Sequence, residues 1–188
     1  MRLRGYDYGT PGAYFVTLCT HQRQMFFNDP VIRAPVEACW RAIPQHAQVI
    51  ELDEWVIMPN HLRGILVIHD RGGVGPNAPT KGAPARREPD HPFSLLSPMR
   101  NTLPVIVRTY KAAVTAACRA ADRSQFAWQR GYYEHVIRDE RQLDVVRRYI
   151  QDNPLRWDLD RDNPESTRGA ARTVVSTDYW ADVEEAFE

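Results

Sequence analysis

The sequence predicts an α+β domain in which an antiparallel sheet carries helices on one face, and two observations predict it. First, four segments rich in aromatic and β-branched residues, at about 14–20, 47–57, 61–69 and 126–137, alternate with segments of helical periodicity. Second, the resulting order is strand, helix, strand, strand, helix, strand, helix. That order excludes a simple repeat of parallel strands joined by crossover helices.

The three helices are predicted from the spacing of apolar residues. The first is expected over 35–43, where apolar side chains recur every three or four positions and Pro35 forces a late start. The second begins at about Leu103. The third covers about 140–152 and ends near Asn153, because Pro154 disfavours helical geometry in the residue before it. Together the elements form a βαββαβα chain of the ferredoxin-like or RRM-like (RNA-recognition-motif-like) kind.

Composition excludes several classes of protein. The 188 residues, 43% of them hydrophobic, suit one domain with its own core. The 24 basic and 24 acidic residues balance, so any nucleic-acid surface must come from local clusters of arginine. Three widely spaced cysteines favour buried thiols in a reducing compartment, and we expect a cytoplasmic protein. No apolar run reaches the roughly 20 residues that span a bilayer.

Two segments are expected to lie outside the core. Residues 70–92 combine glycine and proline with charged residues and predict a flexible surface loop. Residues 158–188 are polar and acidic and predict a C-terminal tail. We therefore expect one domain over residues 1–157, followed by this tail.

The segment 55–69, WVIMPNHLRGILVIH, predicts a β-hairpin that turns at residues 58–60. In a strand, side chains two residues apart face the same way. His61 and Arg63 therefore share one surface, which we expect to be exposed, and Leu62 points to the buried one. Taken alone, a histidine at a hairpin is more often a surface residue than a ligand.

Besides Arg63 on the hairpin, side chains that could contact a nucleic acid occur in two places. The helix from Leu103 has a basic side that could follow a phosphate backbone, although a solvated helix surface explains it equally well. Aromatic residues in the fourth strand could stack on unpaired bases, with core packing as the alternative. The candidate DNA-binding residues are Arg63, Arg100, Arg108, Lys111, Tyr132 and Tyr133.

Six blocks in this order resemble the REP-associated tyrosine transposases, which belong to the HUH single-strand DNA endonucleases and transposases. The blocks are GYDY, PGAYFVTLCT, VIMPNH, LPVIVRTYKAAVT, WQRGYYEHVIRDE and RRYIQDNPLRW. The resemblance covers about residues 5–157. It implies the HUH endonuclease fold and a transposase that binds hairpin-forming repeats in single-stranded DNA, then cleaves and rejoins the strands.

The resemblance also implies site residues. In this family the hairpin reads His-hydrophobic-His, and the two histidines hold a divalent metal, Mg or Mn. Tyr149 matches the nucleophile that forms a 5′ phosphotyrosine, and Asn153 matches a third metal ligand four residues later on the same helix face. Without the resemblance, Tyr149 could equally be a packing residue. Relatives in the superfamily include homodimers that share active sites, so a homodimer is one arrangement open to this chain.

Arg63 departs from the family pattern, because it stands where the second histidine is expected. A guanidinium stays protonated, offers no lone pair and repels a divalent ion, although it could grip a phosphate in a bidentate manner. His135, on the last predicted strand, is the one obvious substitute ligand. Two main hypotheses follow: a transposase that acts through Tyr149, or a weakened DNA-binding relative. An RNA-binding module is a third.

Overall fold

The computed structural model describes residues 6–70, 102–160 and 162–166. The regular elements are β1 (Gly12–Cys19), η1 (His21–Arg23), η2 (Phe26–Asn28), α1 (Pro30–Arg41), α2 (Ile43–His46), β2 (Ile50–Met58), β3 (His61–Ile68), α3 (Leu103–Ala120), β4 (Tyr133–Ile137), α4 (Glu140–Asp152) and η4 (Pro154–Leu159). The loop expected at 70–92 and the tail beyond residue 166 lie outside the described residues.

The four strands form one antiparallel sheet in the order β2-β3-β1-β4. This is the order of a ferredoxin-like sheet, in which β1 and β3 lie at the centre and the last strand joins the edge beside β1. The predicted α+β class and antiparallel sheet are confirmed. No helix in the described part of the chain is both long enough and apolar enough to cross a membrane.

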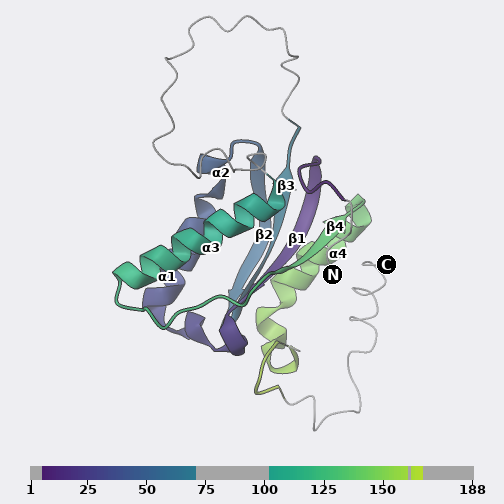
Figure 1. Cartoon of the computed structure of the whole chain (residues 1–188). Coiled ribbons are helices and arrows are strands. Elements are labelled where there is room, and N and C mark those ends of the chain that lie inside the picture. The colour runs from purple at the N-terminus through teal and green to yellow at the C-terminus, as the bar shows by residue number, and fades with distance from the viewer. Residues whose placement is uncertain (1–5, 71–101, 161, 167–188) are drawn as a thin grey trace, which may run out of the picture.

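Helices cover both faces of the sheet, whereas one covered face was expected. Helices α1 and α3 pack on the face that presents Tyr14, Val16 and Leu18 of β1. Helix α4 packs on the opposite face, where Val146 and Ile150 join the intervening β1 residue Phe15 in a second apolar cluster. Figure 1 shows α3 and α4 on opposite sides of the strands. The predicted site residues His61, Arg63 and Tyr149 lie on the α4 face.

Two element boundaries differ from the prediction. Helix α1 begins at Pro30, not residue 35, because the Asp29 carboxylate caps it by accepting a hydrogen bond from the Val31 amide (2.8 Å). Pro35 lies inside this helix, whose buried face holds it on the sheet. The last strand begins at Tyr133, and the residues before it run outside the ladder apart from an isolated bridge between Thr20 and Trp128.

Candidate functional site

The register of β3 places His61 and Arg63 on the α4 face of the sheet. His61 lies opposite Cys19, and Arg63 lies opposite Thr17. Both side chains are fully buried, with 0% and 1% of their surface exposed. The expectation that this surface is open to solvent is therefore wrong, because α4 and the segment after it cover this end of β3. The two side chains do share one face, as the alternation along a strand requires.

Asn60 determines which nitrogen of His61 carries the proton. The Asn60 side-chain amide donates to the backbone carbonyls of Arg23 (3.1 Å) and Asp162 (2.6 Å), so its oxygen is left as an acceptor. That oxygen lies 2.8 Å from Nδ1 of His61. A neutral His61 must therefore carry its proton on Nδ1 and keep a bare lone pair on Nε2. This is the tautomer that can bind a cation or accept a proton through Nε2.

Arg63 is held by two carboxylates from the segment that follows α4. Its guanidinium makes a bidentate pair with Asp160 (2.6 and 3.2 Å) and donates a third hydrogen bond to Asp162 (2.8 Å). Arg23 forms a second ion pair with Asp162 at 2.6 Å. The backbone of Arg23 is left-handed, with φ of 57°, a conformation that a non-glycine residue adopts only under local constraint. Two arginines and two aspartates thus form one ion cluster with balanced charge.

The cluster sets the charge states around it. Burial opposes the charge on Arg63, but Tyr149 and Asp160 outweigh it and raise the pKa of the guanidinium. Burial opposes the charge on Asp160 as well and would raise the pKa of that carboxyl. The hydrogen bonds from Arg63 act against burial, and the pKa lies below its usual value. The pKa of His61 is held well below normal, first by burial and then by Arg63. Near neutral pH the site therefore contains a charged pair beside a neutral imidazole.

Tyr149 lies directly against Arg63. The centre of the guanidinium stands 4.9 Å from the centroid of the Tyr149 ring, a cation–π contact. The ring also packs edge-on against Phe15 with centroids 6.0 Å apart, and only 4% of the residue is exposed. Tyr149 thus contacts the ion cluster through Arg63, and its ring also forms part of the second apolar cluster.

Asn153 is the third predicted site residue beside Arg63, together with His61 and Tyr149. Its side-chain amide donates to the Asp160 oxygen that Arg63 also binds (3.1 Å). Its own oxygen is buried without a hydrogen-bond donor, and so is Nε2 of His61. Asn153 raises the pKa of His61 through a side-chain interaction, against the larger effect of burial, so the two side chains are close neighbours. The structure therefore brings His61, Tyr149 and Asn153 together around Arg63 and leaves two bare lone pairs there.

These residues do not fit the divalent metal that the resemblance implies. Two bare donors remain, from His61 and Asn153, and the position of the second imidazole holds a guanidinium. No group of three His, Cys, Asp or Glu side chains among the described residues could hold an ion. His135 does not replace the missing ligand. It lies four residues along β1 and two strands across from His61, which separates the two Cα atoms by roughly 16 Å.

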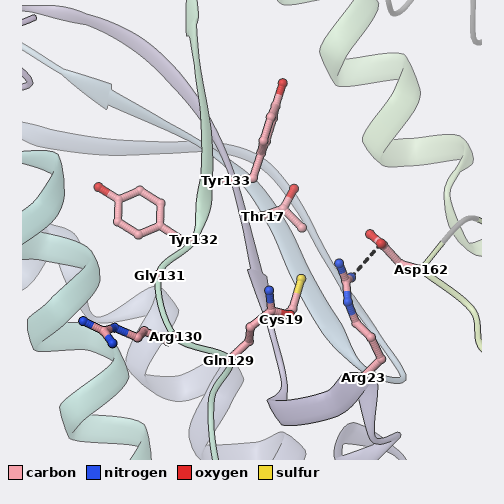
Figure 2. A pocket seen from close by; sticks show the side chains of 9 residues that line it. All are labelled: Thr17, Cys19, Arg23, Gln129, Arg130, Gly131, Tyr132, Tyr133 and Asp162. Atoms are coloured by element: carbon pink, nitrogen blue, oxygen red, sulfur yellow. Dashed lines mark ion pairs between the residues drawn. The ribbon is translucent and has the colours of Figure 1, made fainter. Parts of the chain in front are cut away.

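A cavity of about 490 Å³ adjoins the ion cluster. Figure 2 shows Arg23 and Asp162 on one side of it and Arg130 and Tyr132 on the other. Tyr133, the first residue of β4, is 36% exposed, and its side chain projects away from that of Tyr132. The volume lies in the range of small-ligand sites, which is about 300–1,000 Å³. Arginine and tyrosine side chains can contact phosphates and bases, respectively.

A second hollow, of about 610 Å³, runs between α3 and residues 128–132. Arg108, Lys111, Arg130 and Tyr132 contribute to its lining, so Tyr132 and Arg130 stand between the two hollows. Lys111 is engaged here: its ammonium donates to the carbonyls of Gln129 and Gly131 and lies near the Trp128 ring. Burial lowers the pKa of Lys111 to about 8. Arg100 lies outside the described residues.

Sequence reasoning missed the partners of Arg63. Asp160 and Asp162 lie in a segment that was expected to be a polar tail, and both are buried. Asn60 and Arg23 were also missed. The one available signal was chemical: a buried arginine requires a carboxylate, and the acidic stretch DLDRD follows the helix that carries Tyr149.

No family model matches the chain. An uncharacterised protein of Haemophilus influenzae is 35% identical over 169 residues, which cover 86% of this chain and 90% of that protein, and the two chains belong to one family. Among solved structures, a REP-associated tyrosine transposase bound to a REP hairpin is similar with a TM-score of 0.54 and 19% identity, over 84% of this chain and 74% of that one. This likeness shows a shared fold.

Proposed function

We propose that this chain is a transposase-like protein that binds hairpin-forming single-stranded DNA and cleaves and rejoins the strand through Tyr149. The supporting observation is the meeting of His61, Tyr149 and Asn153 around Arg63. These residues come from β3, from α4 and from the residue that caps the end of α4, and they converge at one point of the sheet. An imidazole, a phenol and an amide are the groups that the resemblance assigns to strand transfer.

The proposed step transfers a phosphoryl group without net loss of bond energy. The Tyr149 oxygen bonds to a DNA phosphorus, the bond to the 3′ oxygen breaks, and the phenol proton leaves as the 3′ oxygen gains one. The product is a 5′ phosphotyrosine, and attack by another 3′ hydroxyl reverses the step and restores the phenol. A phenol with a reference pKa of about 10 needs an activated phosphate. Arg63, whose guanidinium contacts the Tyr149 ring, would supply positive charge for that phosphate.

The two hollows beside residues 129–133 would hold the DNA next to this point. Arg23 and Arg130 would contact phosphates, and Tyr132 or Tyr133 would stack on an unpaired base. Arg108, exposed on α3, would extend the path along a hairpin stem. Lys111 would act indirectly, because its ammonium holds the backbone of Gln129 and Gly131 in place.

A second candidate function is hairpin binding without cleavage. It is favoured by the closed ion cluster, in which Asp160 and Asp162 occupy the Arg63 hydrogen bonds that a phosphate would need. It is also favoured by the burial of Tyr149. In this case the sheet and the hollows would still bind DNA, and the nucleophile would serve as a packing residue.

A covalent adduct separates the two functions. The full chain is incubated with a hairpin oligonucleotide labelled at its 3′ end, with Mn²⁺ or with EDTA, and analysed on a denaturing gel. A 5′ phosphotyrosine keeps the 3′ label on the protein, whereas a 5′ label on the same oligonucleotide is released. We expect the adduct in the wild type and in Tyr132→Phe and Tyr133→Phe, and its loss in Tyr149→Phe.

The remaining outcomes decide against cleavage. Hairpin binding without an adduct, in both Mn²⁺ and EDTA, would select the second candidate. Preference for the RNA version of the same stem-loop would contradict both DNA functions.

A further inference from the structure

We infer that Arg63 takes over the positive charge that a divalent ion would supply at this site, so that the site receives a DNA phosphodiester without a metal. The part of this inference that concerns DNA rests on the proposed function. The part that concerns metal binding depends only on the residues around Arg63.

Arg63 is fully accommodated by its surroundings. A guanidinium buried to 1% exposure is strongly unfavourable unless carboxylates pair with it and fill its hydrogen bonds. Here three hydrogen bonds from Arg63 reach two aspartates. Asp160 is satisfied in turn, by the Asn153 amide and by the backbone amide of Asp162 (2.8 Å). A site that had only lost an imidazole, with no guanidinium in its place, would leave Asp160 without a charged partner and available as a ligand.

Few ligand atoms remain around Arg63 for a metal ion. Among the described residues around Arg63, the bare donors are Nε2 of His61 and the side-chain oxygen of Asn153, which is fewer than a metal site requires. Asn153 and Arg63 bind the same oxygen of Asp160, so an ion at the bare donors would stand next to a fixed positive charge. Because that charge is always present on a guanidinium, the repulsion does not depend on pH.

A phosphate can make the same contacts with Arg63 as a carboxylate. Carboxylate and phosphate offer the same pair of oxygens to the fork of a guanidinium. A DNA phosphate that replaced the Asp160 carboxylate would keep the geometry of Arg63, whose guanidinium lies over the Tyr149 ring at 4.9 Å. Arg23, paired with Asp162, supplies a second charge beside it. With Asp160 displaced, two arginines would face one aspartate, Asp162, and the remaining positive charge would balance the phosphodiester without an additional cation.

The test measures Mn²⁺ binding to the full chain without DNA, by electron paramagnetic resonance. We expect no specific site in the wild type, and a gained site in Arg63→His, at least about tenfold tighter than any wild-type binding. Arg63→Gln is the matched control, because it removes the charge without adding an imidazole, and it should gain less than Arg63→His. Adding His61→Ala to Arg63→His should remove the gained site. One Mn²⁺ held by the wild type and lost in His61→Ala would overturn the inference.

A measurement on the wild type alone covers the case in which the variants fail to fold. Hairpin affinity should be unchanged when EDTA replaces Mn²⁺, whereas a loss of tenfold or more in EDTA would overturn the inference and leave the proposed function standing. Absence of hairpin binding under both conditions would contradict the proposed function, and the Mn²⁺ result would still decide the metal question.

Discussion

Asn60 is the residue on which the geometry of the site depends most directly. It is fully buried and links three segments, through the carbonyls of Arg23 and Asp162 and through Nδ1 of His61. Asn60→Ala would leave two carbonyls and one ring N–H without partners. We expect the free energy of unfolding to fall by about 1–3 kcal/mol, measured by urea denaturation.

The matched control for this variant is Asn28→Ala, at an exposed asparagine whose amide makes only a weak contact with Met25. Its effect should stay within about 0.5 kcal/mol. If the two variants lower the free energy of unfolding equally, the Asn60 hydrogen bonds do not stabilise the site as argued above.

At this scale the sequence identified the reactive groups and missed their partners. His61 and Arg63 could be placed on one surface because strand alternation is a local rule. Asp160 and Asp162 could not be placed, because a contact between residues nearly a hundred positions apart depends on how α4 and η4 return to the sheet. A rule for neighbouring residues in a strand does not predict such a contact.

At the scale of elements, Gly64 controls how closely α1 approaches the sheet. A Cβ atom at Gly64 would lie 2.6 Å from Cζ2 of Trp40 and 3.0 Å from Cβ of Trp55. Gly64→Ala should therefore push α1 outward and lower the free energy of unfolding by about 1–3 kcal/mol. In a Trp40→Phe background the ring atom that clashes is absent, so the same substitution should be less destabilising. Equal losses in both backgrounds would show that Trp40 is not the obstacle.

Helix α4 is tied to β2 by a bidentate ion pair between Arg147 and Asp53, with distances of 2.7 to 3.2 Å. The hydrogen bonds from Arg147 lower the pKa of Asp53 below its reference value of 3.8. A carboxyl group whose pKa is lowered by folding stabilises the protein above its unfolded-state pKa, and this stabilisation is lost as the pH falls through the folded-state value. The advantage of the wild type over Asp53→Asn should thus be constant above about pH 5 and shrink below about pH 4.

This comparison is made by urea denaturation across the acid range, with Asp144→Asn as the control. Asp144 contacts the same arginine from an exposed position, so its substitution should change the free energy of unfolding by well under 1 kcal/mol. A gap between wild type and Asp53→Asn that did not change with pH would exclude the ion pair as its source.

The elements themselves were predictable, and their arrangement only in part. Alternation of aromatic and β-branched segments identified the strands, and Pro154 marked the end of α4. The second covered face was missed, although β3 carried a signal for it. The run from Gly64 to Ile68 is apolar at nearly every position, which is typical of a strand buried on both sides. The late start of β4 could not be read, because Phe126 and Trp128 are as aromatic as strand residues yet pack into the core from a non-strand segment.

At the scale of the whole molecule, balanced charge means that DNA binding must be local. Two of the basic groups proposed to contact DNA, Arg130 and Arg108, lie beside the β4 edge of the sheet and on α3. Arg41 is equally exposed but lies at the end of α1, where it packs over Trp55 of the opposite edge strand β2. If the DNA phosphates follow only the β4 edge, Arg108 and Arg130 should contribute to DNA binding and Arg41 should not.

Salt dependence of hairpin binding measures that path. Each phosphate contact contributes about 0.7 to 0.9 to the slope of log affinity against log salt, so Arg108→Ala and Arg130→Ala should each reduce the slope by nearly one. Tyr133→Ala should weaken binding by about 1–3 kcal/mol without changing the slope, because stacking releases no counterions. Arg41→Ala should change neither quantity. A slope that fell equally for all three arginines would mean that the protein attracts DNA by its general field, and the two hollows beside residues 129–133 would then not be the binding surface.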